Sequence, residues 1–326
     1  MSTTIEHITY MEEAALRVRT PLLEGIIVPA WGTNLISLIW RESGTPLLRT
    51  PASREAYLAK PVLHGTPVLF PPNRIDGGTF DFNGRTYTFP VNEKDKGNHI
   101  HGVLVDAPWT IAHTAADEGA AVVETAVRAK DVPAVFAALP HDFTARMRFV
   151  FEQGRVTQTF TVDNDDEAPM PWGLGYHTTF HFPLTAGGDL SHCTFQLQTD
   201  QIWELGERLL PTGRLLPAPR REELEQGLSL QGIALDDVFQ SRDQGDNEAV
   251  LTDEQAGLRI VYRADSQFGQ WVVYNAGGES GFLCPEPYTW VTNAPNVKAP
   301  AELTGLRAVA PGQRAVAVTQ ISVSAR

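Results

Sequence analysis

The chain has 326 residues, with 26 lysines and arginines against 39 aspartates and glutamates, and a formal net charge of −13 at pH 7. A chain of this length needs no disulfide scaffold, and its two cysteines show neither metal-ligand nor redox spacing, which favours a reduced intracellular setting. The negative charge repels phosphate backbones and argues against nucleic acid as the main partner. No apolar run approaches the ~18 residues of a membrane helix, and the polar N-terminus indicates no secretory signal. We therefore expect a cytoplasmic globular protein without a membrane partner.

Short alternating runs bounded by glycine, asparagine, aspartate and proline recur along the chain. The clearest predicted hairpin joins residues 79–82 to 85–89 through Asn83-Gly84, a pair that suits a type I′ turn because both residues accept positive φ. Residues 143–152 and 155–164 repeat this pattern around 153–154. Further strands are expected over 109–115, 120–129, 258–263, 270–275 and 315–324, and helical turns only over 132–139 and 221–226.

Many short strands, punctuated by 27 glycines and 23 prolines, are typical of an all-β protein built as a large antiparallel sandwich. No linker, internal repeat or low-complexity tract marks a boundary between two cores. We therefore expect a single domain that spans residues 1–326.

Two polar segments in the first third of the chain are candidates for a site. In residues 65–75 (GTPVLFPPNRI), an apolar strand ends in a Pro-Pro turn and then presents Asn73 and Arg74. The planar guanidinium fork suits hydroxyl or carboxylate oxygens, although a surface turn with a solvated arginine is the simpler alternative. In residues 97–102 (GNHIHG), His99 and His101 would share one face of a strand, as metal ligands or hydrogen-bonding groups. A cupin-type metal site also needs a carboxylate soon afterwards, and apolar residues follow instead, so no metal is expected.

Two further segments hold candidate acid and base groups. Residues 172–182 (WGLGYHTTFHF) place His177 after glycines that allow close approach of a ligand, and histidine is well suited to donate a proton near neutral pH. Residues 283–290 (LCPEPYTW) hold Glu286 between two prolines and beside aromatic residues, where desolvation would raise its pKa toward that of a useful base. A core histidine and an edge-strand glutamate are the structural alternatives. Residues 235–239 (LDDVF) are a weaker fifth candidate.

In this order, the five segments resemble the aldose 1-epimerase (galactose mutarotase-like) family, from residues 25–32 (GIIVPAWG) to residues 310–313 (APGQ). The resemblance implies a β-supersandwich and the interconversion of the α and β anomers of a free monosaccharide, without a cofactor. The protein would be a monomer or a homodimer. The resemblance makes His177 the general acid and Glu286 the general base. It assigns the binding of sugar hydroxyls to Asn73, Arg74, His101, Asp236 and, with a looser alignment, Gln270.

Some residues depart from the pattern of galactose-type members. Val103 follows Gly102 where a second glycine is usual, Asp237 stands where a histidine is common, and Tyr176 replaces an asparagine before His177. Galactose specificity therefore does not follow from the resemblance. Asp236 is preferred over Asp237 because its distance to Phe239 fits the family spacing.

The chemistry agrees with the assigned acid and base. Opening a pyranose removes the proton from the C1 hydroxyl while the ring oxygen is protonated, which one acid and one base can do in concert. Activity should then depend on pH as a bell, with Glu286 controlling the acid limb and His177 the alkaline limb. Stacking platforms for the sugar, or simply core residues, would be Trp109, Tyr288 and Trp290.

Three other functions are compatible with these segments. One is a non-catalytic carbohydrate-binding or sensor protein on the same fold, for which an intact acid–base pair is unnecessary. The second is glycoside hydrolysis by Asp236 and Glu286, which leaves His177 without a role. The third is a mutarotase for a phosphorylated or sulfonated sugar, which the negative net charge and the lack of a dense cluster of basic residues disfavour.

Overall fold

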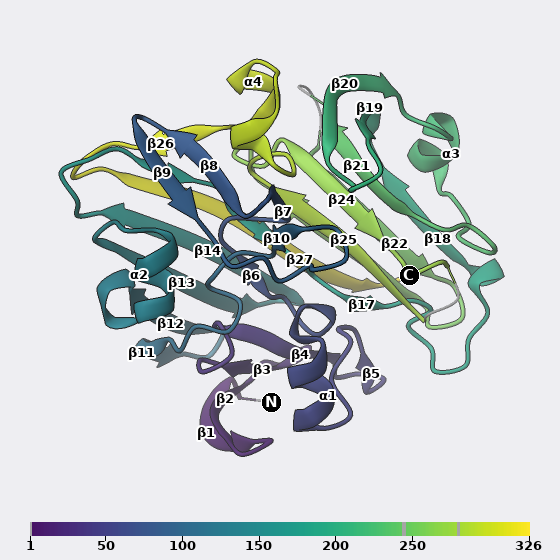
Figure 1. Ribbon diagram of the computed structural model, residues 1–326. Helices are drawn as coiled ribbons and strands as arrows, with labels where there is room; N and C mark the ends of the chain where they lie inside the picture. The colour runs from purple at the N-terminus through teal and green to yellow at the C-terminus, as the bar shows by residue number, and fades with distance from the viewer. Residues whose placement is uncertain (1, 243–245, 279–280) are drawn as a thin grey trace.

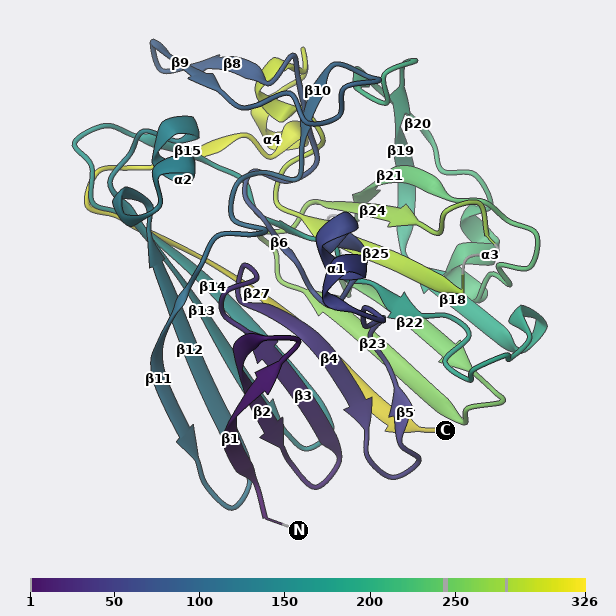
Figure 2. The same cartoon turned by 60° about the horizontal axis from the view of Figure 1, so that its bottom comes forward.

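The computed structural model describes residues 2–242, 246–278 and 281–326, and three larger antiparallel sheets hold most of the described strands (Figures 1 and 2). The first sheet is N-terminal and its strands pair in chain order. Its strands are β1 (Thr4–Tyr10), β2 (Glu13–Arg19), β3 (Leu23–Val28), β4 (Asn34–Trp40) and β5 (Thr45–Pro46).

The second sheet holds eight of the described strands and includes the longest ones. In spatial order they are β11 (Thr110–Ala116), β12 (Ala120–Arg128), β13 (Phe143–Glu152), β14 (Arg155–Asn164), β27 (Arg314–Ala325), β23 (Leu258–Ala264), β22 (Glu248–Asp253) and β18 (Cys193–Leu197). Buried and partly exposed residues alternate along β14, because successive side chains of a strand point to opposite faces. The N-terminal sheet covers part of the buried face, where Thr33 Oγ1 and Thr125 Oγ1 lie 2.6 Å apart.

The third sheet also holds eight described strands, and it carries most of the candidate site. The order is β20 (Pro211–Pro217), β19 (Thr199–Leu205), β21 (Asp236–Ser241), β24 (Gln270–Tyr274), β25 (Phe282–Tyr288), β16 (Gly175–Tyr176) and β6 (Val68–Leu69), and β17 (Phe180–His181) also pairs with β25. Every residue of β25 is buried, as expected for a strand that is covered on both faces.

Short pairs and helical turns connect these sheets. The strand pairs are β7 (Arg74–Asp76) with β10 (Asn98–Ile100), β8 (Thr79–Phe82) with β9 (Arg85–Thr88), and β15 (Met170–Trp172) with β26 (Arg307–Val309). The α-helices are α1 (Arg54–Ala59), α2 (Pro133–Ala138), α3 (Arg221–Gln226) and α4 (Ala301–Thr304), and the 3₁₀ turns are η1 (Pro61–Leu63), η2 (Ala129–Asp131), η3 (Leu190–His192) and η4 (Ala294–Asn296). In the described part of the chain, no helix is long and apolar enough to cross a membrane.

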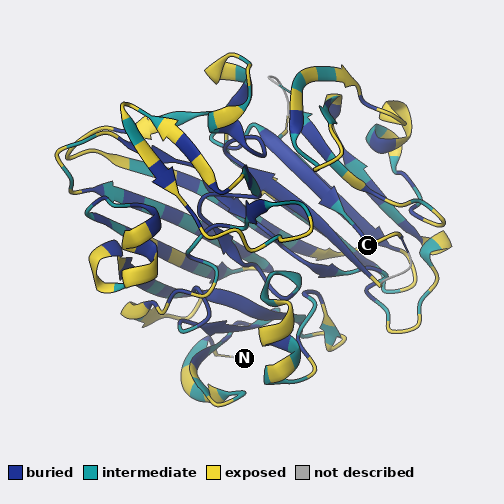
Figure 3. Cartoon of the chain, viewed as in Figure 1, coloured by how far each residue is buried: buried dark blue, intermediate teal, exposed yellow. Residues whose placement is uncertain are grey.

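The core lies between the sheets. Buried residues fill the central strands, whereas exposed residues gather on the helices and on the β8–β9 hairpin (Figure 3). The main hydrophobic cluster takes residues from Leu16 to Val323, so both ends of the chain contribute to it.

The all-β antiparallel prediction is confirmed, and so is the clearest hairpin. Asn83 and Gly84 have φ of 48° and 76°, the positive values that a type I′ turn requires. The prediction of helical turns was incomplete, because α1 and α4 are also present. The start of α1 has a local signal, since the Ser53 side chain accepts a hydrogen bond from the Ala56 N–H, as an N-cap residue does.

Candidate active site

Neighbouring strands of the third sheet bring residues together that are far apart in the sequence. Glu286 of β25 lies opposite Val272 of β24, and Tyr274 of β24 lies opposite Asp236 of β21. On the other side of β25, β16 ends just before His177, whose N–H donates to Pro67 O at 3.2 Å. The sheet therefore places one acidic group, one basic group and their neighbours on a common face.

A cavity of about 740 Å³ opens over this face. Six of the seven residues that the family resemblance assigns to the site line it, namely Asn73, Arg74, His101, His177, Asp236 and Glu286. The cavity is within the ~300–1,000 Å³ that small-molecule sites usually have.

The candidate acid and base are in direct contact at the buried end of the cavity. His177 Nε2 lies 3.3 Å from Glu286 Oε1, and their side chains are only 6% and 2% exposed. At this distance His177 and Glu286 can share one proton. Because water is excluded from both side chains, the electrostatic interaction between them is stronger than it would be in solvent.

The other carboxylate oxygen of Glu286 has its own partner. The Tyr288 hydroxyl donates to Glu286 Oε2, and Asn73 Nδ2 donates to the Tyr288 oxygen at 3.3 Å. Tyr288 is completely buried. These bonds fix the rotation of the carboxylate, so that Oε1 remains directed at His177.

Burial favours the neutral form of both groups, and it therefore shifts their pKa values in opposite directions. The pKa of Glu286 is raised well above its ordinary value by desolvation, and the Tyr288 hydrogen bond partly opposes this shift. Desolvation lowers the pKa of His177 to about 4. Between these limits the pair holds one proton, and its titration belongs to the pair rather than to either residue.

We expect Tyr288→Phe to lower kcat by about tenfold or more. A hydrogen bond to a charged group contributes about 1.5–3 kcal/mol, so its loss disfavours ionised Glu286 and raises the pKa of that carboxyl further. Because the pKa of Glu286 is the higher of the two, it controls the alkaline limb of the pH–rate profile, and this limb should move to higher pH. Tyr87→Phe is the matched control, because the Tyr87 hydroxyl is buried and bonded to His141 Nε2 at 2.7 Å, outside the cavity. An unchanged alkaline limb in Tyr288→Phe would show that this bond does not tune Glu286.

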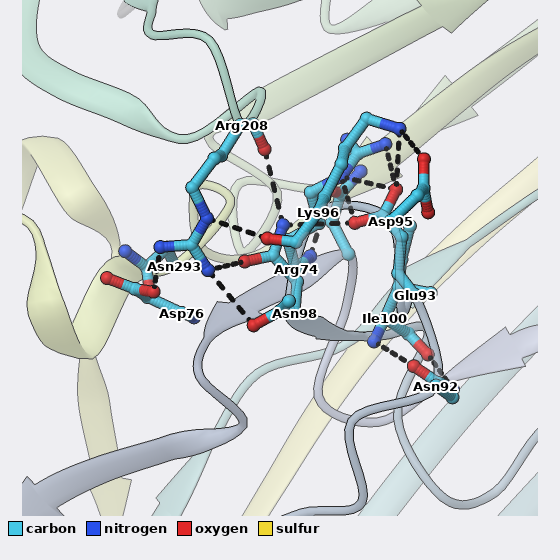
Figure 4. A network of polar contacts seen from close by, with 12 residues as sticks. Arg74, Asp76, Asn92, Glu93, Asp95, Lys96, Asn98, Ile100, Arg208 and Asn293 are labelled. Carbon is cyan, nitrogen blue, oxygen red and sulfur yellow. Dashed lines mark hydrogen bonds and ion pairs between the residues drawn. The ribbon is translucent and has the colours of Figure 1, made fainter.

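Arg74 is oriented by a carboxylate that the sequence interpretation did not identify. Its Nε and Nη2 atoms donate to Glu93 at 2.9 and 3.0 Å, a bidentate arrangement (Figure 4). Asn98 Nδ2 also donates to Glu93 Oε2 at 3.0 Å. Burial alone would raise the pKa of Glu93, but the bonds from Arg74 and Asn98 outweigh burial and lower it. Arg74 is therefore a neutralised donor of defined direction, not a free cation.

A loop between β19 and β20 fastens to the same network. Arg208 donates to Asp76 Oδ1 at 2.6 Å, to Asn98 Oδ1 at 2.8 Å and to the carbonyls of Lys96 and Gly97 at 2.6 and 3.0 Å (Figure 4). The next residue, Leu209, lines the cavity. The guanidinium of Arg208 thus ties this loop to the segment that orients Arg74.

His101 is aimed at the cavity by an unusual backbone conformation. β10 ends at Ile100, so His101 does not share a strand face with His99, and its φ is 71°. At Gly102, φ is 69° and a Cβ atom would lie 2.4 Å from Phe70 C, which explains why glycine stands there. Burial, with the nearby His177 and Arg74, lowers the pKa of His101 well below its ordinary value. Its Nδ1 has no partner in the described residues, and a neutral imidazole there suits a sugar hydroxyl.

The register of β21 separates the two candidate aspartates. Asp236 lies opposite Tyr274 on the cavity face, and Asp237, opposite Val273, points to the other face. Burial raises the pKa of both carboxyls.

Gln270 does not reach the cavity. It lies on the same face of β24 as Val272, about 7 Å further along the strand. Its Oε1 accepts from Trp203 Nε1 at 2.8 Å and its Nε2 donates to Leu303 O at 2.9 Å. Both ends of the amide are occupied by protein partners, so the structure does not bring Gln270 together with the other site residues.

The three aromatic residues that were considered as stacking platforms belong to the core. None of Trp109, Tyr288 and Trp290 is among the described residues that line the cavity, and all are at most 4% exposed. The cavity instead includes Tyr274, which the sequence interpretation had not singled out.

A set of three metal-ligand side chains does exist in the site. Donor atoms of His177, Cys284 and Glu286 lie within 4.8 Å of one another, whereas His99 and His101 belong to no such group among the described residues. Burial raises the pKa of Cys284 well above its ordinary value, and its sulfur lies 3.3 Å from Thr179 Oγ1. Thiolate and carboxylate are the ligating forms, and burial disfavours both here.

We therefore expect activity to survive exhaustive chelation without change. The measurement is the rate of the anomer interconversion that the family resemblance implies, before and after treatment with a chelator, with Cys284→Ser as a second test. Loss of activity that a divalent ion restores in the wild type, but not in Cys284→Ser, would establish a metal site.

Comparison with known proteins agrees with this fold. The aldose 1-epimerase family model matches residues 16–322, so the chain belongs to the aldose 1-epimerase family. The structure is similar to a galactose mutarotase-like protein from Clostridium acetobutylicum (28% identity, TM-score 0.95, covering 100% of this chain and 99% of that one). It shares its fold with galactose 1-epimerase from Lactobacillus acidophilus (14% identity, TM-score 0.79, 99% of both chains). The sequence is also similar to that of the uncharacterized protein YihR of Escherichia coli K12, at 28% identity over 156 residues, which is 47% of this chain and 46% of that protein.

Proposed function

We propose that this protein is an aldose 1-epimerase that interconverts the α and β anomers of a free, uncharged aldose. The observation that carries the proposal is the 3.3 Å contact between His177 Nε2 and Glu286 Oε1 at the closed end of the cavity. The two oxygens that exchange protons in this reaction are bonded to the same carbon of the sugar. An acid and a base that act on them together must therefore lie a few Å apart.

In the proposed reaction, Glu286 accepts the proton of the C1 hydroxyl while His177 donates a proton to the ring oxygen. The C1–O5 bond breaks, a carbonyl forms at C1, and the pair is left with a protonated carboxyl and a neutral imidazole. Rotation about C1–C2 presents the other carbonyl face, and the reverse transfers close the ring.

The resting pair and the pair after ring opening differ only in which group holds the proton. Burial of both groups favours the neutral form, and the Tyr288 hydrogen bond favours the ionised form of Glu286. Burial is the larger effect, so protonated Glu286 with neutral His177 is the more populated form, and the Tyr288 bond raises the share of the ionised pair that begins ring opening. We assign the binding of the sugar hydroxyls to Asn73, Arg74, His101 and Asp236, and a free monosaccharide is the minimal substrate.

The basic side chains of the cavity are paired with a carboxylate, which favours an uncharged substrate over a phosphorylated or sulfonated one. Among the described residues that line the cavity, Arg74 and Lys96 both pair with Glu93, at 2.9 and 3.5 Å. Lys60 also lines the cavity and forms no ion pair with another described residue, but the carboxylate of Asp106 is part of the same lining.

Polarimetry of freshly dissolved α-glucose and α-galactose tests the proposal. The enzyme should bring the optical rotation to equilibrium faster than buffer, in proportion to its concentration. Binding of sugars without acceleration would identify a carbohydrate-binding protein instead. Release of the aglycone from aryl glycosides would point to a hydrolase that uses Asp236 and Glu286.

A further inference from the structure

Arg208 lies in the loop between β19 and β20, beside the cavity but outside it. It is not among the described residues that line the cavity, whereas the next residue, Leu209, is. Its side chain is 44% exposed, and that of its ion-pair partner Asp76 is 45% exposed. An exposed ion pair of this kind contributes little to stability by itself. A role for Arg208 in the site must therefore come from its hydrogen bonds to buried groups.

The guanidinium of Arg208 is surrounded by acceptors from β7 and from the residues at the start of β10 (Figure 4). Its three nitrogens donate to four groups, namely Asp76 Oδ1, Asn98 Oδ1 and the carbonyl oxygens of Lys96 and Gly97. Four acceptors around one planar fork determine its orientation, and the ammonium group of a lysine, a point charge on a flexible stem, cannot reproduce this arrangement. Arg208 is thus held in one direction relative to β10.

Asn98 connects Arg208 to the interior of the network, and it is completely buried. Its Oδ1 accepts from Arg208 at 2.8 Å, while its Nδ2 donates to Glu93 Oε2 at 3.0 Å and to the Arg208 carbonyl oxygen at 3.2 Å. Rotation of the amide by half a turn would exchange its nitrogen and oxygen and turn the oxygen toward the Glu93 carboxylate. Arg208 opposes this rotation, because its guanidinium can only donate and therefore requires the oxygen on its own side.

Glu93 transmits this orientation to Arg74. Its carboxylate accepts from Arg74 Nε and Nη2 at 2.9 and 3.0 Å. The remaining nitrogen, Nη1, lies 3.4 Å from Asn73 Oδ1, and both Arg74 and Asn73 line the cavity. The oxygen of a rotated Asn98 amide would repel the Glu93 carboxylate. The carboxylate would then shift, and the direction in which Arg74 faces the cavity would change with it.

We propose that Arg208 is a positioning residue for sugar binding, which holds Arg74 in its binding direction through Asn98 and Glu93. The proposal rests on the proposed epimerase function, in which Arg74 binds a sugar hydroxyl. Because the acid–base pair is not part of this chain of contacts, loss of Arg208 should weaken sugar binding and leave the proton transfers intact. A residue that only stabilised the fold would instead change the amount of active enzyme, with no change in KM.

The test compares Arg208→Ala, Arg208→Lys and the matched control Arg214→Ala with the wild type. Arg214 lies on β20 of the same hairpin, and its Nε donates to Glu204 Oε2 at 2.8 Å, outside the cavity. Polarimetry with glucose and galactose gives kcat and KM, and calorimetry gives Kd without turnover. Arg74→Ala, alone and combined with Arg208→Ala, shows whether the two arginines act along one route. The exchange rate of the Arg74 Nε–H proton, measured by NMR, needs no sugar, and thermal unfolding shows whether each variant is folded.

We expect Arg208→Ala to raise KM and Kd by about tenfold, as weakening of a hydrogen bond to a charged group does, with kcat and both limbs of the pH profile nearly unchanged. Arg208→Lys should behave in the same way, because it keeps the charge but not the planar fork. Arg214→Ala should match the wild type. The Arg74 Nε–H proton should exchange faster in Arg208→Ala than in the wild type. In the Arg74→Ala background, Arg208→Ala should not weaken binding further.

A lower kcat with an unchanged KM, or wild-type binding in Arg208→Lys, would overturn the proposal while leaving the epimerase function intact. Further weakening in the Arg74→Ala background would also overturn it, and would assign the effect of Arg208 to its neighbour Leu209 in the cavity wall. Absence of anomerisation with every sugar would instead refute the epimerase function. The proton exchange of Arg74 would then still decide whether Arg208 fixes its direction.

Discussion

Glu286→Gln is expected to lower kcat by about 10²-fold or more while KM changes little. The amide keeps the shape of the side chain and can still accept the Tyr288 hydrogen bond, but it cannot take a proton from the C1 hydroxyl. A loss of this kind affects the transition state rather than the binding of the ground state. Polarimetry at saturating sugar gives kcat, and calorimetric titration gives the affinity.

Asp237→Asn is the control for this prediction. It makes the same carboxylate-to-amide change at a residue that points away from the cavity face of β21. The rate of this variant should equal that of the wild type. Near-wild-type anomerisation by Glu286→Gln would remove Glu286 from the mechanism, provided that thermal unfolding shows both variants to be folded.

His177→Asn is expected to lower kcat by about 10²-fold or more, the usual range for loss of a general acid, and to change the pH profile. The wild-type pair is active with one proton. Below pH about 4, His177 also becomes protonated and the pair holds two protons, whereas above the raised pKa of Glu286 it holds none. The profile should therefore rise near pH 4 and fall at the higher pKa.

These pKa shifts reverse one expectation from the sequence, in which Glu286 controlled the acid limb and His177 the alkaline limb. That assignment placed the pKa of Glu286 below that of His177, whereas burial raises the first and lowers the second, so we now expect the opposite limbs. In His177→Asn the residual reaction needs only ionised Glu286. The bell should then become a single rise at the pKa of Glu286.

His101→Asn distinguishes the two histidines of the cavity. Its main effect should be on KM, since His101 is proposed to hold a hydroxyl group. If His101→Asn instead removes the rise near pH 4 and His177→Asn keeps it, the acid has been assigned to the wrong histidine.

The sequence alone determined the class of fold, and it indicated the acid–base pair that we propose. Alternation with a period of two residues requires strands, and Asn83-Gly84 requires a tight hairpin, because both effects act over a few neighbouring residues. The motifs around His177 and Glu286 are equally local. The order of the motifs along the chain was sufficient to indicate the family, and the matched family model confirms it.

Only the tertiary structure decided which polar groups meet. Glu93 and Arg208 belong to no motif, yet they fix Arg74 and the loop before Leu209 through contacts between residues up to 132 positions apart. Tyr288 looked like a stacking platform, but its place in β25 makes it the donor to Glu286. Gln270 lies on the same face of β24 as Val272, but its amide is bonded to Trp203 and Leu303. The face on which a residue lies follows from local alternation along its strand. What covers that face depends on segments that are far away in the sequence. Burial by those segments sets the pKa values of His177 and Glu286.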